Sequence, residues 1–173
     1  MRPTFLMLLR LLAATAVSIV LVPAVATAQQ VRLIGDFRDW SAYSALDGVG
    51  NICFALAKPV EVVPQPDGFT AAYIYLTHRP AESVSNEINL VAGFAFAPDT
   101  PATLSISGET FDLFTESDAA WLLDPARADG LASAMRAGTT LVMEGTSDKG
   151  IKIRETFSLS GATAASRAID GEC

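Results

Sequence analysis

The chain has 173 residues and a formal net charge of −7, with nineteen acidic side chains against twelve basic ones. An acidic surface repels phosphate backbones and anionic lipid, so the composition argues against nucleic-acid binding and against polybasic attachment to membranes. The single histidine and two widely spaced cysteines also exclude a multi-histidine zinc site and a Cys-x-x-Cys redox motif.

The first 28 residues are predicted to be a secretory signal peptide. Two arginines, Arg2 and Arg10, precede an apolar stretch at 11–22, and small residues end the segment at Ala28. This is the three-part layout of a cleavable signal. The alternative, a membrane anchor, is disfavoured because Pro23 ends the apolar run short of the roughly 20 residues that a bilayer span needs. We therefore expect a mature domain over residues 29–173, with a net charge of −9 and no stable membrane insertion.

The mature chain reads mainly as short strands separated by turn residues. The predicted strands are 39–45, 52–58, 69–77, 87–96, 102–107, 110–114, 139–144 and 151–159. Tight turns at 47–50, at Ser107-Gly108-Glu109 and at 147–150 join six of these strands into three hairpins. The alternation of the last strand is loose, which leaves room for a bulge near Thr156.

Two helices are predicted near the end of the chain. Asp124 is the predicted N-cap of the first helix, and Pro125 is its first helical residue. Leu131 and Met135 then face one way, four residues apart, before Gly138 ends the run. An alanine-rich segment at 161–169 is expected to form a second short helix that brings the last residue back toward the core.

Cys53 and Cys173 are the only cysteines, and export would deliver them to a compartment where disulfides persist. If they pair, the bond closes a loop of over a hundred residues, for which the loop-entropy model gives about 4 to 5 kcal/mol. The alternative is two thiols that are free or paired between molecules.

Catalytic patterns are sparse. His78 lies before Arg79-Pro80 without a nucleophile-elbow motif, so we expect an exposed loop histidine whose replacement is nearly silent. The sequence leaves open a catalytic pair of carboxylates for glycoside hydrolysis, because acidic residues are numerous. They include Asp36, Asp39, Glu116, Asp118 and Asp124. Neither a metal nor another cofactor is predicted.

Five aromatic residues are the candidate binding surface, since such rings supply large contact area at low entropic cost. They are Trp40, Tyr43, Tyr73, Tyr75 and Trp121. Tyr73 and Tyr75 lie two apart and therefore share one face of a strand. The competing interpretation is that these rings pack in the core.

The order of these features resembles the invasion-associated locus B family of exported alphaproteobacterial proteins. The resemblance rests on Asp36-Phe37-Arg38-Asp39-Trp40 with Tyr43, Cys53, Trp121 before Asp124, the stretch 131–138, the turn 145–150, and the segment from Phe157-Ser158-Leu159-Ser160-Gly161 through Ala164, Ala165 and Ile169 to Cys173. Many family members carry a further cysteine pair, whereas this chain has Ser44 in the first hairpin and no third cysteine. The resemblance implies a periplasmic or surface-exposed β-rich domain, linked by name to host-cell invasion in some pathogens, with no established catalytic residues.

These patterns predict a mainly β domain, an antiparallel sandwich or open barrel with one or two short helices and one disulfide. Its expected role is that of a periplasmic or secreted envelope protein that binds a protein or glycan partner and is not an enzyme. The alternative is a small exported hydrolase that acts on sugars or peptidoglycan through paired carboxylates.

The signal-peptide prediction is tested by the intact mass of the exported protein. Signal peptidase accepts the small residues Ala26 and Ala28, so the mass should correspond to a chain that begins at Gln29. A mass that retains residues 1–28 would identify an uncleaved anchor and overturn the predicted location.

Overall fold

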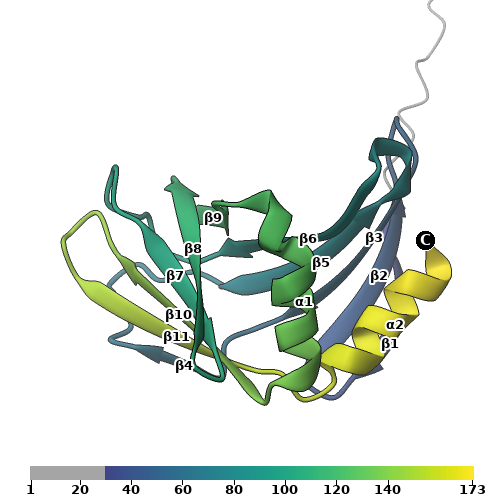
Figure 1. Ribbon diagram of the computed structural model, residues 1–173. Helices are drawn as coiled ribbons and strands as arrows, with labels where there is room; N and C mark the ends of the chain where they lie inside the picture. Colours follow the sequence, from purple (N-terminus) through teal and green to yellow (C-terminus); the bar gives the residue numbers. More distant parts are fainter. Residues whose placement is uncertain (1–29) are drawn as a thin grey trace, which may run out of the picture.

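In the computed structural model, residues 30–173 are described and form eleven strands with four short helices (Figure 1). The strands are β1 (Arg32–Phe37), β2 (Trp40–Leu46), β3 (Asn51–Ala57), β4 (Glu61–Val63), β5 (Tyr73–Arg79), β6 (Val84–Val91), β7 (Ala102–Ile106), β8 (Glu109–Glu116), β9 (Ala119–Leu122), β10 (Thr140–Thr146) and β11 (Lys152–Ser158). The helices are η1 (Pro80–Glu82), η2 (Pro125–Arg127), α1 (Ala128–Ala137) and α2 (Ala162–Glu172). The predicted signal segment 1–28 lies outside the described residues.

All eleven strands belong to one antiparallel sheet in the order β1-β2-β3-β5-β6-β9-β8-β7-β10-β11-β4. The edge strands β1 and β4 do not pair with each other, so the sheet is open. Figure 1 shows the sheet curving around α1 and α2, which lie against its inner face. The predicted mainly β fold with one or two short helices is confirmed, and the sheet is open and forms no sandwich.

The core lies between the inner face of the sheet and the two α-helices. Because side chains alternate along a strand, every second residue points inward. Leu104, Phe111 and Phe157 are fully buried on β7, β8 and β11, and α1 adds Leu131 and Met135. Burial of each such side chain stabilises the fold by about 1.5 to 3 kcal/mol. Among residues 30–173, no helix has the length and hydrophobicity that a bilayer-spanning helix needs.

The three predicted hairpins are confirmed as β2–β3, β7–β8 and β10–β11. In the β7–β8 turn, Ser107 and Gly108 have φ values of +51° and +87°, as a type I′ hairpin turn requires. In the β2–β3 turn, the Asp47 carboxylate accepts hydrogen bonds at 2.8 Å from the backbone N–H groups of Gly50 and Val49. These two bonds hold the pKa of Asp47 below its usual value.

The predicted cap is also confirmed, since the Asp124 side chain accepts a hydrogen bond from the Ala126 N–H at 3.0 Å. The helix begins as the single 3-10 turn η2 and continues as α1. The second helix, α2, reaches Glu172, three residues beyond the predicted end. Gly161 precedes it with φ at +99°, and a Cβ there would lie 1.7 Å from the carbonyl oxygen of Phe37, so only glycine fits this junction.

Some boundaries were wrong. Strand β5 begins at Tyr73, because residues 69–72 form a loop in which the Phe69 N–H donates to Pro66 and the Thr70 N–H donates to Gly93. Strand β6 covers 84–91 rather than 87–96, and the β10–β11 register runs without the bulge suggested near Thr156. Strands β1, β4 and β9 were missed.

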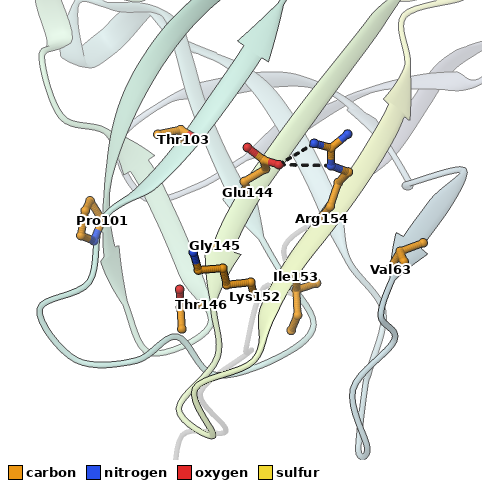
Figure 2. A pocket seen from close by; sticks show the side chains of 9 residues that line it. All are labelled: Val63, Pro101, Thr103, Glu144, Gly145, Thr146, Lys152, Ile153 and Arg154. Atoms are coloured by element: carbon orange, nitrogen blue, oxygen red, sulfur yellow. Dashed lines mark hydrogen bonds and ion pairs between the residues drawn. The ribbon is translucent and has the colours of Figure 1, made fainter.

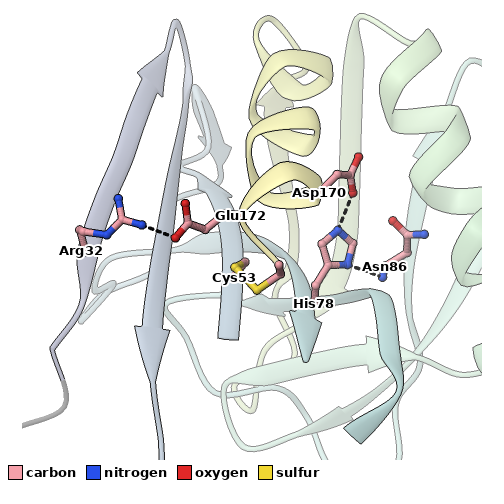
Figure 3. The surroundings of a disulfide bond; sticks show 7 residues. Arg32, Cys53, His78, Asn86, Asp170 and Glu172 are labelled. Atoms are coloured by element: carbon pink, nitrogen blue, oxygen red, sulfur yellow. Dashed lines mark hydrogen bonds and ion pairs between the residues drawn. A yellow bond between two sulfur atoms is a disulfide. The ribbon is translucent and has the colours of Figure 1, made fainter. Parts of the chain in front are cut away.

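The last turn of α2 is fastened to the sheet by the predicted disulfide. Cys53 and Cys173 are bonded, with Cα atoms 6.0 Å apart across a sequence separation of 120 residues (Figure 3). Cys53 is fully buried on the inner face of β3. Arg32 of β1 forms an ion pair with Glu172 on the same helical turn, so two strands are tied to one end of α2.

His78 was predicted to be an exposed loop residue, and this prediction is wrong. It lies in β5 directly opposite Cys53 and is only 7% exposed. Its Nδ1 accepts a hydrogen bond at 3.1 Å from the backbone N–H of Asn86, and its Nε2 lies 2.9 Å from Oδ1 of Asp170 in α2 (Figure 3). Because Nδ1 is an acceptor, we assign the ring proton to Nε2, whose N–H donates a hydrogen bond to Asp170.

We therefore expect His78→Ala to be destabilising rather than silent. The change would leave the partly buried Asn86 N–H without its acceptor, which costs up to about 1 to 3 kcal/mol. Thermal and urea unfolding of the disulfide-bonded domain measure this loss. Asp170→Asn is the matched control, because its amide oxygen still accepts from Nε2, and it should lower stability less. Unchanged unfolding of His78→Ala would contradict the assigned role.

Candidate functional site

Three of the five predicted aromatic residues gather on the outer face of the sheet. Tyr43 of β2 stacks on Phe54 of β3 with ring centroids 5.3 Å apart. Phe54 lies 6.2 Å from Tyr75 of β5, which in turn lies 6.0 Å from Tyr73. We call these four half-buried rings the outer aromatic cluster. They stay partly exposed because both α-helices lie against the opposite face of the sheet (Figure 1).

Trp40 does not belong to this surface, and its assignment to the binding face is wrong. It is 1% exposed, and its Nε1 donates a hydrogen bond at 2.9 Å to the carbonyl oxygen of Ser158. The physical reason is parity, since Trp40 stands three positions before Tyr43 in one strand and therefore points to the other face. Trp40 instead packs in the core and joins the start of β2 to the end of β11.

Trp121 lies on the outer face, but two strands away from the cluster. It stacks on Phe114 of β8 at 5.4 Å, and Phe114 is 45% exposed. The pairing registers place Leu56, Tyr75, Asn89, Trp121 and Phe114 in one row across five strands. Asn89 therefore separates the two aromatic groups.

Sequence reasoning missed Phe54 and Phe114. A signal for Phe54 was present, because it alternates with the small inward residues Cys53 and Ala55 in the second predicted strand. The same alternation places Phe114 on the opposite face of its strand from the buried Leu113. Neither residue was singled out, because apolar side chains in a strand are ordinarily expected to face the core.

A hollow of about 740 Å³ adjoins the outer aromatic cluster. Tyr43, Tyr73 and Tyr75 line it together with Ser41 and Leu56. The remaining lining residues come from the β1–β2 turn, from the last residue of β3 and from the segment that follows it, namely Arg38, Asp39, Ala57, Lys58, Pro59 and Val60. The arrangement combines aromatic faces, hydroxyl groups and charged side chains in one open depression, which suits binding.

Three further hollows lie elsewhere on the described residues. One of about 460 Å³ follows β10 and β11, where the Glu144 carboxylate is held by Arg154 at 2.7 and 3.1 Å (Figure 2). A groove of about 380 Å³ beside Trp121 contains Glu87, and a hollow of about 290 Å³ beside β4 contains Glu61. Each of these four hollows of the described residues is lined by one carboxylate, so none of the four brings together the two that glycoside hydrolysis needs, about 5 to 9.5 Å apart.

Within residues 30–173, no three His, Cys, Asp or Glu side chains cluster in a way that could hold a metal ion. The one strongly perturbed acid is Glu155, on the inner face of β11 between Met143 and Val62 in the pairing register. It is 0% exposed, and neither carboxylate oxygen has a hydrogen-bond partner among the described residues. Burial raises the pKa of Glu155 to about 8. Because solvent does not reach it, this acid is placed to affect stability rather than to contact a substrate.

Comparison with known proteins shows similarity at the level of structure. No protein-family model matches the chain, and no curated protein matches it by sequence. A crystal structure of invasion associated protein B from Bartonella henselae is similar, with a TM-score of 0.55 and 15% sequence identity. The similarity covers 84% of this chain and 99% of the other. At this identity it shows a common fold, so the predicted family resemblance is supported at the level of structure, and family membership stays a prediction.

Glu155 should make stability depend on pH. The folded chain holds a proton on this acid up to about pH 8, whereas in the unfolded chain the carboxyl has its ordinary pKa of 4.5. Because the folded chain keeps this proton and the unfolded chain loses it, the free energy of unfolding falls as the pH rises from about 4.5 toward 8, by at most about 1.4 kcal/mol for each pH unit. Below about pH 4.5 both states hold the proton, and this loss is absent.

Glu155→Gln should remove this loss, so the variant should gain stability relative to the native chain as the pH rises through that window. Urea unfolding at a series of pH values measures it, with the exposed Glu116→Gln as control. A Glu155→Gln difference that is constant across the window would contradict the assignment.

Proposed function

We propose that this protein is exported, is cleaved after Ala28, and acts in the periplasm or outside the cell as a binding protein of the invasion-associated locus B type. The disulfide supports export, because such bonds persist in oxidising compartments. The fold shared with invasion associated protein B supports the protein type. The printed name of that protein refers to invasion. The binding role proposed here rests on the residues of this chain.

The outer aromatic cluster is the observation that carries the proposal. Four rings on three adjacent strands stay partly exposed on a face that neither α-helix covers. Burying aromatic surface on contact with a partner is favourable, and tyrosine adds a hydroxyl group that hydrogen-bonds at a wet boundary. The partner is expected to be an envelope or host protein or a glycan.

The hydrolase alternative has less support. Each of the four described hollows contains a single carboxylate, and Glu144 is already neutralised by Arg154. Glu155 has the raised pKa of a general acid but is fully buried on the inner face. A binding role needs none of these groups to titrate.

Capture experiments with paired variants test the binding role. The mature, disulfide-bonded domain is immobilised and exposed to envelope extract and to host-surface extract. Replacing both Tyr43 and Tyr75 with Ser should reduce the retained partner at least about tenfold, as expected when central aromatic contacts are lost. Phe114→Ser removes an exposed ring outside the cluster and should leave capture unchanged.

The melting temperature of each variant confirms that it is folded. The proposal fails if capture is the same with and without Tyr43 and Tyr75. It also fails if the domain hydrolyses peptidoglycan or oligosaccharides at a rate that an acidic-residue variant abolishes.

A further inference from the structure

The hollow beside the outer aromatic cluster has a distinct chemical lining. Leu56 is the register partner of Ser41 on one side and of Tyr75 on the other, and all three residues line the hollow. Tyr73 also lines the hollow, and the Lys58 ammonium lies over its ring, 5.6 Å from the centroid. The aromatic surface is thus continuous with a cation at the rim.

Two cations line this hollow without a carboxylate partner. Among residues 30–173, neither Arg38 nor Lys58 forms an ion pair, whereas Arg32, Arg79, Arg127 and Arg154 are all paired with acids. Arg38 makes only a 3.3 Å hydrogen bond to the neutral Ser160 hydroxyl. Asp39 is the one carboxylate of the lining, so the lining residues have more positive than negative charges, and Asp36 adjoins them through its hydrogen bond with Ser41.

The polar groups of the hollow match a hydroxyl-rich ligand. Burial, with a smaller contribution from Tyr73, raises the pKa of the Tyr75 phenol, so its hydroxyl stays a hydrogen-bond donor at neutral and mildly alkaline pH. The Ser41 hydroxyl donates to Asp36 at 2.6 Å and retains its capacity to accept. Aromatic faces contact the apolar faces of ring-shaped ligands, and the unpaired cations attract an anionic group.

We propose that this hollow binds an anionic glycan, with a sugar ring lying against Tyr73 and Tyr75 and its carboxylate held by Lys58 and Arg38. The inference rests on the proposed binding function and specifies its partner class. Neutral sugar would leave the two cations unused.

Calorimetric titration of the mature, disulfide-bonded domain tests the proposal. The probes are a tetramer of galacturonic acid and a tetramer of galactose, which differ in the carboxylate. We expect binding of the acidic tetramer, weaker binding at high salt because exposed charges are screened, and at least about tenfold weaker binding of the neutral tetramer.

Charge-removing variants locate the site. Lys58→Gln and Arg38→Gln should each weaken binding of the acidic tetramer about tenfold. Lys152→Gln is the control and should not change binding, because this exposed lysine lines the separate hollow of about 460 Å³ along β10 and β11. Equal binding of both tetramers, or binding that is insensitive to Lys58 and Arg38, would overturn the proposal.

The outcome is separable from that of the proposed function. If no acidic tetramer binds while partner capture still depends on Tyr43 and Tyr75, the glycan assignment is wrong and the binding function stands. If the acidic tetramer binds through Lys58 and Arg38 but capture ignores the tyrosines, the hollow is a glycan site and the captured partner uses another surface.

Discussion

The attachment of helix α2 to strands β3 and β5 is the constraint on which the rest of the structure depends. An isolated helix of this length is marginal in water, so α2 needs tertiary contacts to persist. Its buried face packs on the sheet, and the disulfide at Cys53 with the His78–Asp170 contact holds its last turn in place. Because α1 and α2 cover the inner face, no second sheet packs on it, and the outer face of the sheet is left open.

The two faces of the sheet therefore have different physical roles. The inner face holds the core, including one acid, Glu155, whose burial without a partner costs stability as the pH rises. The outer face carries half-exposed rings and unpaired cations around a hollow of about 740 Å³. A fold shared with another protein at 15% identity does not carry such a surface with it, so the binding role rests on the residues of this chain.

The sequence by itself determined the local features of this protein. Turn chemistry identified three hairpins, Asp124 marked a helix start, and two cysteines in a chain predicted to be exported indicated their bond. The spacing of Tyr73 and Tyr75 placed both on one face. Each of these inferences depends on residues that are close together in the chain or on a pairing with no intramolecular alternative.

Only the tertiary structure decided which strands are neighbours and which side chains meet. The sheet joins β6 to β9, β7 to β10 and β11 to β4 over long separations, and such pairings leave little trace in local composition. Trp40 was misplaced because the buried face of β2 is set by what packs on it. His78 was misjudged because its partner Asp170 lies 92 positions away on α2, and no local pattern records a contact made by long-range folding.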